Sequence, residues 1–235
     1  MTVDFAKAAA KPRVLIVDDQ PLMREGIAHL LGGLNELQVC GAADSIASAR
    51  DQLANFEPQL VIMELNLGSG DIIEFLKSLR EEFRKTRVLI YTSLDERLFV
   101  ERALGAGASG YLMKQEPAER LVEAVHAVLD GDLYVSRRIS ALLLRRSVEN
   151  HGASRSTTDA TIDSLTDREL HVFRLLGSGL STRCIAADLN LSVKTVEAHR
   201  EHIKHKLGSV SGTSLIQMAT DWVRDTFQPG RSAEL

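Results

Sequence analysis

The sequence predicts a doubly wound α/β domain followed by a separate all-α domain of four helices. Two patterns in the 235-residue chain predict this division. The first part alternates short apolar runs with amphipathic stretches, as βα units around a parallel sheet do. The last part holds only helical patterns joined by short turns. We expect the α/β domain at residues 12–130, a linker helix with a flexible linker at 131–163, and the all-α domain at 164–227.

Five short apolar runs predict the strands of the first domain. The clearest are Val14–Val17 and Leu60–Met63, because continuous apolar runs of this length are typical of strands buried on both faces. The helical stretches between them end with an amphipathic run that begins at Pro117. Five such units predict a five-stranded parallel sheet with right-handed crossovers. The expected strands lie near residues 13–18, 38–42, 60–64, 87–92 and 109–113.

The chain behind the sheet predicts one more helix and then a linker. Residues 136–147 combine apolar and basic side chains in a helical pattern. Residues 147–163 are rich in Ser, Thr, Asn and Gly and lack periodicity, which is typical of a flexible linker.

The first helix of the second domain has clear start and stop signals. Thr166 and Glu169 have the spacing of a capping box, with Leu165 and Leu170 at the positions of a hydrophobic staple. Gly177 predicts the end of this helix.

Three further helices are expected. Ser181 is the N-cap candidate of a short helix, and Ser192 caps a longer one that Gly208 ends. The last helix is expected over residues 214–225. A helix, a tight turn and a longer polar helix form the helix-turn-helix arrangement, in which the longer helix enters the major groove of DNA.

The longer helix has two faces. Val196, Ile203 and Leu207 form one buried stripe, and the opposite face is polar. Central side chains would meet base edges, and cations at the edges would meet phosphates. A merely solvated helix face is the alternative, since carboxylates repel phosphate. The candidate DNA-binding residues are Lys194, Thr195, Glu197, Ala198, Arg200, Glu201, Lys204, His205 and Lys206, with Lys194 and Arg200 as the first choices and Lys204 and Lys206 on phosphates.

Acidic residues follow two of the predicted strands. Asp18 and Asp19 follow the first strand, and Glu64 follows the third. The carboxyl ends of parallel strands face one crevice, so these side chains should meet there. Three carboxylates repel one another and require a divalent cation, a proton or both.

Charge and composition exclude several classes of protein. Residues 1–130 carry 14 Lys+Arg and 20 Asp+Glu, or −6, while residues 131–235 carry 14 and 12, or +2. An acidic front and a mildly basic back fit a sensor joined to a nucleic-acid reader. No apolar run approaches the roughly 20 residues that span a bilayer, and no export signal precedes the sheet. We expect a cytoplasmic protein with no membrane partner, and two cysteines in the core of different domains rather than in a disulfide.

Together these motifs resemble a known family. Residues 165–169, 185–186, 192–200 and 206–208 closely resemble the LuxR-type helix-turn-helix, and the front half resembles a flavodoxin-like receiver domain. The whole is similar to NarL/FixJ-type two-component response regulators. The resemblance implies a non-enzymatic transcription regulator that binds double-stranded DNA at paired half-sites as a homodimer. A sensor histidine kinase or another protein would regulate it, and the dimer surface would be either the receiver face near Tyr111 or the Thr213–Trp222 helix.

The resemblance also assigns roles in the receiver pocket. Thr92 matches the hydroxyl that turns toward a phosphoryl group, Lys114 the lysine that pairs with this group, and Tyr111 the aromatic switch residue. The candidate cofactor is Mg²⁺, and its implied ligands are Asp18, Asp19, Glu64 and the backbone carbonyl of Asn66.

Three positions depart from the family pattern. Glu64 stands where the family has its phospho-accepting aspartate, Gly68 replaces the usual proline of the following loop, and Gln115 rather than proline follows Lys114. Glutamate is longer than aspartate by one C–C bond, about 1.5 Å. Since a displacement near 1 Å can slow a reaction about a hundredfold, ordinary phosphorylation should be impaired.

Several interpretations of Glu64 stay open. The preferred one is regulation without phosphorylation, in which Glu64 partly mimics a phosphoryl group and leaves the protein pre-activated. The others are slow phosphorylation of Glu64 and a glutamate engineered into an ordinary regulator. A Mg²⁺-dependent phosphohydrolase would use the same acids but leaves the helix-turn-helix unexplained. An interaction module whose DNA reader has lapsed is the remaining alternative.

Overall fold

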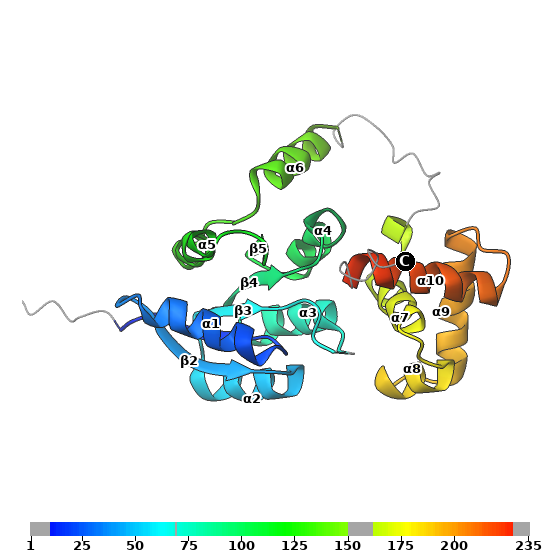
Figure 1. Ribbon diagram of the computed structural model, residues 1–235, viewed down its shortest axis with the longest axis horizontal. Coiled ribbons are helices and arrows are strands. Elements are labelled where there is room, and N and C mark those ends of the chain that lie inside the picture. The colour runs from blue at the N-terminus through cyan, green and yellow to red at the C-terminus, as the bar shows by residue number, and fades with distance from the viewer. Residues whose placement is uncertain (1–9, 69, 150–161, 228–235) are drawn as a thin grey trace, which may run out of the picture.

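Five parallel strands form the sheet of the front domain in the order β2-β1-β3-β4-β5 (Figure 1). The computed structural model describes residues 10–68, 70–149 and 162–227. The sheet confirms the doubly wound fold, and its strand order reverses between β1 and β3, where ligands of such folds bind. The strands are β1 (Arg13–Val17), β2 (Gln38–Ala43), β3 (Leu60–Met63), β4 (Arg87–Thr92) and β5 (Gly110–Met113).

The expected strand bounds are correct to within one residue. β1 and β3 end one residue earlier than expected, so that Asp18 and Glu64 lie in the loops that follow them. This difference matters because successive side chains of a strand must point to opposite faces of the sheet, whereas side chains in a loop can both turn into the same pocket.

Helices cover both faces of the sheet. Val14 and Ile16 of β1 pack with α1 and α5 on one face, while Leu15 and Val17 point to the opposite face with α2, α3 and α4. This alternation within one strand is the reason that the strand is apolar throughout. The helices are α1 (Pro21–Gly32), α2 (Ile46–Phe56), α3 (Ile72–Glu82), α4 (Glu96–Ala106) and α5 (Ala118–Asp130).

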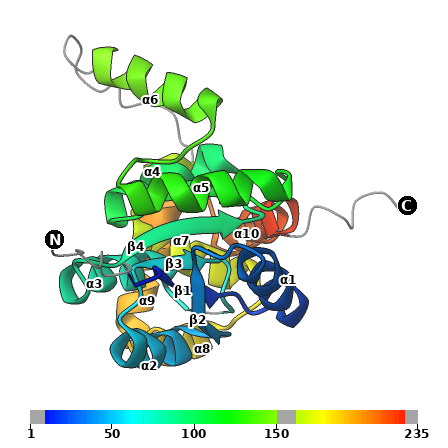
Figure 2. The same ribbon diagram turned by 90° about the vertical axis from the view of Figure 1, so that its left-hand side faces the viewer.

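The chain after α5 first follows the edge of the sheet. The backbone N–H of Tyr111 donates to the carbonyl of Tyr134, at 2.8 Å. Helix α6 (Arg137–Glu149) begins against the receiver, where Ile139 is fully buried in the core, and its later turns project away from the sheet (Figure 2). It ends two residues later than expected. Most of the expected flexible linker, residues 150–161, lies outside the described residues.

The second domain consists of a short 3₁₀ turn, η1 (Ile162–Ser164), and four helices, which confirms the expected architecture. The capping box is present, with the Thr166 hydroxyl accepting from the Glu169 N–H and the Glu169 carboxylate accepting from the Thr166 N–H. Ser181 and Ser192 are N-caps as expected. The last helix begins two residues earlier than expected. The helices are α7 (Asp167–Gly177), α8 (Thr182–Asp188), α9 (Val193–Lys206) and α10 (Gly212–Phe227).

Two residues differ from their expected structural roles. Gly177 ends α7, but it also lies against α10, where a Cβ atom would approach the Ala219 carbonyl oxygen to 2.2 Å. The glycine is therefore needed for helix packing. Both cysteines are free, as expected, but Cys184 is exposed on α8 rather than buried, because it points away from the core residues Ile185 and Ala186. No helix within the described ranges has the length and apolar character needed to cross a membrane.

Candidate functional site

The acidic pocket lies at the carboxyl ends of β1 and β3. These strands pair with Val17 beside Met63, which brings the following residues, Asp18 and Glu64, together. The backbone N–H of Glu64 donates to the Val17 carbonyl at 2.9 Å. Asp18 and Glu64 are only 2% and 4% exposed, so their charges need a partner.

Lys114 supplies that partner. Its ammonium lies 2.5 Å from Oδ2 of Asp18 and 2.8 Å from Oε2 of Glu64, and its side chain is 6% exposed. Burial alone would lower the pKa of Lys114, but the two carboxylates outweigh burial and raise this pKa. The buried pocket thus holds a bridged pair of acids with a charged lysine between them.

The second oxygen of Glu64 faces the predicted switch residues. The Thr92 hydroxyl donates to Oε1 of Glu64, and the backbone N–H of Asn66 donates to the same oxygen at 2.9 Å. Thr92 in turn accepts from the Leu94 N–H at 3.3 Å, and the Tyr111 hydroxyl donates to the Leu94 carbonyl at 2.9 Å. Hydrogen bonds therefore connect Glu64 to Tyr111, which is 1% exposed.

The predicted metal ligands do not converge in this arrangement. Asp18 and Glu64 turn toward Lys114, and Oδ1 of Asp18 accepts from the Gln20 N–H at 2.9 Å, while Asp19 is exposed. In the described part of the chain, no group of three or more Asp, Glu, His or Cys is placed to hold a metal ion. The Lys114 ammonium occupies the position between the Asp18 and Glu64 carboxylates that a metal ion would need, so the residues as arranged do not fit Mg²⁺.

The polar face of α9 is open to solvent. Val196 and Ile203 are fully buried and Leu207 is 6% exposed, as the two-faced pattern predicts. On the opposite side the structure exposes six of the candidate DNA-binding residues. They are Lys194, Thr195, Glu197, Ala198, Glu201 and His205.

The other three candidates are basic residues that contact neighbours in the same domain. Arg200 donates to the Thr182 hydroxyl of α8 at 2.5 Å. Lys204 pairs with Glu201 of its own helix at 2.5 Å. Lys206 pairs with Glu169 of α7 at 2.7 Å. The contacts of Arg200 and Lys206 hold α9 against α8 and α7, a role that a helical projection of α9 alone could not show.

The first contact between the domains involves residues that the sequence interpretation missed. Helix α7 lies between the receiver and α9 (Figure 1). Asp71, the N-cap of α3, accepts from Arg168 Nη1 and from His171 Nδ1, both at 3.0 Å. Burial alone would raise the pKa of Asp71. The hydrogen bond and charge of His171, and to a smaller extent the hydrogen bond from Arg168, outweigh burial and lower this pKa to about 2. The only signal in the sequence was the spacing of Arg168, His171 and Arg174, three residues apart on one helix.

A second contact forms at the start of α7. Asp167 accepts from Lys77 of α3 at 2.9 Å and from Arg102 of α4 at 3.1 Å. Arg102 also donates to the Leu165 carbonyl at 2.8 Å. Beside these pairs Trp222 of α10 packs against Phe99 of the receiver, with ring centroids 6.5 Å apart.

Comparisons with known proteins identify the class. Residues 14–126 match the family described as response regulator receiver domain, and residues 163–219 match bacterial regulatory proteins of the luxR family. The chain belongs to the response regulators with a LuxR-type DNA-binding domain, and it is a transcriptional regulator that binds DNA.

Particular relatives extend over most of the chain. The oxygen regulatory protein NreC of Staphylococcus aureus is 30% identical over 208 residues, which cover 88% of this chain and 96% of NreC. RcsB from Salmonella enterica serovar Typhimurium, solved bound to the rprA promoter, shares the fold with a TM-score of 0.68 at 23% identity, covering 90% of this chain and 99% of that one. A LuxR-family response regulator from Aurantimonas sp. SI85-9A1 is 31% identical with a TM-score of 0.54, over 60% of this chain and all of its own.

Proposed function

We propose that this protein regulates transcription through a receiver that Glu64 holds in its switched arrangement without phosphorylation. One observation carries the proposal: the Glu64 carboxylate contacts Thr92, Lys114 and the Asn66 N–H at once. Thr92 and Lys114 are the residues that a phosphoryl group would engage in the family. The added methylene lets the carboxylate reach them. A carboxylate carries about one charge against the −1.5 to −2 of a phosphate, so the mimicry is partial.

Slow phosphorylation of Glu64 is the alternative. It would require a carboxylate oxygen to attack a phosphoryl donor. Oε1 is held by a hydroxyl and a backbone N–H, Oε2 is held by an ammonium, and the residue is 4% exposed. Both oxygens would have to leave these partners before reacting, which supports the phosphorylation-independent form. A sensor kinase as regulator stays a prediction.

Labelling with acetyl phosphate tests the proposal. We expect the wild-type protein to stay unlabelled while Glu64→Asp becomes labelled, because the shorter side chain withdraws from Thr92 and Lys114 and leaves room for a phosphoryl group. The expected difference in rate is about a hundredfold or more. Mass spectrometry of the intact protein measures it, and Glu64→Gln serves as the unreactive control. Equal labelling of the glutamate and aspartate forms would contradict the proposal.

Magnesium binding through Asp18, Asp19, Glu64 and Asn66 stays a prediction that the geometry does not favour. Receiver domains generally bind Mg²⁺ in this acidic pocket. Here the cation would have to displace the Lys114 ammonium from Asp18 and Glu64. We therefore propose that Lys114 supplies in this protein the positive charge that a metal ion supplies elsewhere.

We further propose that α9 reads DNA through its exposed face, in pairs of half-sites. RcsB has been solved as two dimers bound to two parallel DNAs. In this chain α10 exposes Ile216 and Met218, at 42% and 38%, which suits a dimer contact through that helix. The receiver face near Tyr111 is the alternative dimer surface.

Lys194→Ala tests the reading face. Lys194 is exposed near the start of α9, so its loss should remove one phosphate or base contact without disturbing the fold. We expect weaker binding at all salt concentrations, with the slope of log affinity against log salt lower by about one. Lys206→Ala is the contrasting variant. Since Lys206 pairs with Glu169, we expect a lower melting temperature rather than a changed slope. An unchanged affinity and slope in Lys194→Ala would remove this residue from the interface.

A further inference from the structure

We infer that the loop between β3 and α3 is the docking site for helix α7 of the same chain, so that the receiver passes its state to the DNA-binding domain through this contact. Three residues of the receiver define the docking site: Asn66, Gly68 and Asp71. Only the regulatory meaning of this contact rests on the proposed function; the docking itself stands independently.

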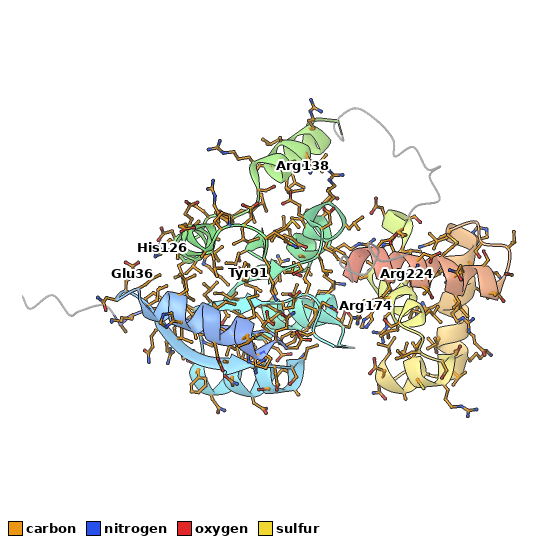
Figure 3. The ribbon with its side chains drawn as sticks, viewed as in Figure 1. Glu36, Tyr91, His126, Arg138, Arg174 and Arg224 are labelled. Atoms are coloured by element: carbon orange, nitrogen blue, oxygen red, sulfur yellow. The ribbon has the colours of Figure 1, made fainter. Side chains whose placement is uncertain are left out.

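Three side chains on one face of α7 form the other half of the contact. Arg174 lies between the two domains (Figure 3), where its Nη1 donates to Oδ1 of Asn66 at 3.2 Å and to the Gly68 carbonyl at 2.9 Å. His171 and Arg168, about one and two turns earlier on α7, both contact Asp71. Arginine presents several donors in a fixed fork, which suits two acceptors on one loop. We call Arg168, His171 and Arg174 the α7 clamp.

His171 connects the two arginine contacts. Its Nε2 lies 3.2 Å from Nη2 of Arg174, and a guanidinium can only donate, so Nε2 accepts. Its Nδ1 therefore carries the proton and donates to Asp71 at 3.0 Å. The imidazole thus lies between a receiver carboxylate and the arginine that holds the loop. The clamp is thus a connected network rather than a set of separate surface pairs.

The backbone of Gly68 makes its carbonyl available to Arg174. Gly68 has φ +52°, in the left-handed region, and no atom lies within 4 Å of where its Cβ would be. The glycine is required for its backbone angle and not for space. The proline that is usual at this position in the family fixes φ near about −65° and could not adopt this conformation. The departure at residue 68 therefore permits the docking contact.

Asn66 couples the clamp to the acidic pocket. Its backbone N–H donates to Oε1 of Glu64, and its side-chain oxygen accepts from Arg174. A change in the carboxylate at position 64 would move the backbone of Asn66 and hence the acceptor of Arg174. Leu94, which belongs to the hydrogen-bonded path from Glu64 to Tyr111, also lines the cavity of about 60 Å³ between the domains, together with Trp222. Two paths thus run from the pocket to the docked domain.

Docking on this site leaves the DNA-reading face open. Lys194, Glu197 and Glu201 of α9 are exposed, while the contacts to the receiver described above come from the start and face of α7 and from Trp222 of α10. The docking site therefore controls how the reading domain is oriented and how much of α10 is covered, through Trp222.

Trp222 provides the readout, because it is the single tryptophan of the chain and it packs between Phe99 of the receiver and Phe173 of α7. In Arg174→Ala we expect the equilibrium constant for docking of the two domains to fall about tenfold or more, because the hydrogen bonds of a charged side chain are lost. Trp222 emission should shift to the red and become more accessible to acrylamide. Lys194→Ala is the matched control: it should alter DNA affinity and leave Trp222 unchanged. If Arg174→Ala stays folded by circular dichroism with unchanged Trp222 emission, the docking site is wrong.

Gly68 gives an independent pair of variants. Gly68→Pro should release Trp222 as Arg174→Ala does, whereas Gly68→Asn should retain docking, because asparagine tolerates the left-handed region. Equal release in both variants, or in neither, contradicts the backbone argument.

Glu64→Ala tests the coupling to the pocket. We expect partial release of Trp222, because Asn66 loses the acceptor that holds its backbone. An unchanged Trp222 in this variant overturns the coupling. Failure of the phosphorylation-independent function would show itself separately, as labelling of the wild-type protein with acetyl phosphate.

Discussion

Lys114→Ala is expected to destabilise the receiver domain by about 3–5 kcal/mol, the usual effect of removing one partner from a buried ion pair. The reason is the loss of the ammonium that bridges Asp18 and Glu64, two acids that are almost fully buried. Urea unfolding followed by far-ultraviolet circular dichroism measures the change. Lys77→Ala is the control, since Lys77 is 44% exposed and pairs across the surface, where ion pairs contribute at most about 1 kcal/mol.

The same variant tests whether Lys114 and a divalent cation compete for the acidic pocket. Without the ammonium the carboxylates are free to accept a divalent ion, so Mg²⁺ should raise the stability of Lys114→Ala more than that of the wild type. An equal Mg²⁺ effect in both proteins would show that Lys114 and the metal do not compete.

The pH dependence of the wild type follows from the raised pKa of Lys114. The ordinary pKa of this group is 10.5, and the folded protein raises it. Because the folded state binds the proton more tightly, the ion pair contributes fully below pH 10.5 and its contribution is lost as the pH rises through the folded-state value. Lys114→Ala should lack this alkaline loss, which a series of urea unfolding curves above pH 9 would show.

Gly177→Ala is expected to destabilise the DNA-binding domain by about 2–3 kcal/mol. A Cβ at this position would lie 2.2 Å from the Ala219 carbonyl oxygen and 2.6 Å from a methyl carbon of Val223. A backbone carbonyl cannot rotate away as a side chain can, so α7 and α10 would have to separate. The gain of about 1 kcal/mol in helix propensity does not offset this. A lower melting temperature in calorimetry, with weaker DNA binding at physiological temperature, is the expected result.

Gly105→Ala is the matched control for this substitution. Gly105 also lies near the end of a helix, α4, but no atom lies within 4 Å of its Cβ position. This variant should gain stability by about 1 kcal/mol, because only the propensity term remains. If both glycines respond alike, the packing explanation for Gly177 fails.

Much of the fold could be predicted because its signals are local. The capping box of Thr166 and Glu169, the caps Ser181 and Ser192, and the apolar run before Glu64 are each read within about one helical turn or one strand. The structure retains all of them. The predicted chemistry at Glu64, Thr92 and Lys114 depended instead on a resemblance in the order of these residues. Nothing local to any one of them indicated their contact.

The sequence by itself determined the two folds, the order of the pocket residues and the exposed face of α9, since periodicity and capping act over a few neighbouring residues. The tertiary structure alone decided which charges meet. Lys114 and Asp18 are 96 residues apart in the chain, and Arg174 and Asn66 are 108 apart. It also decided that Arg200 and Lys206 hold helices together and that Lys114 takes the center of the acidic pocket. Such pairings depend on backbone positions set by the whole fold, which no pattern of neighbouring residues encodes.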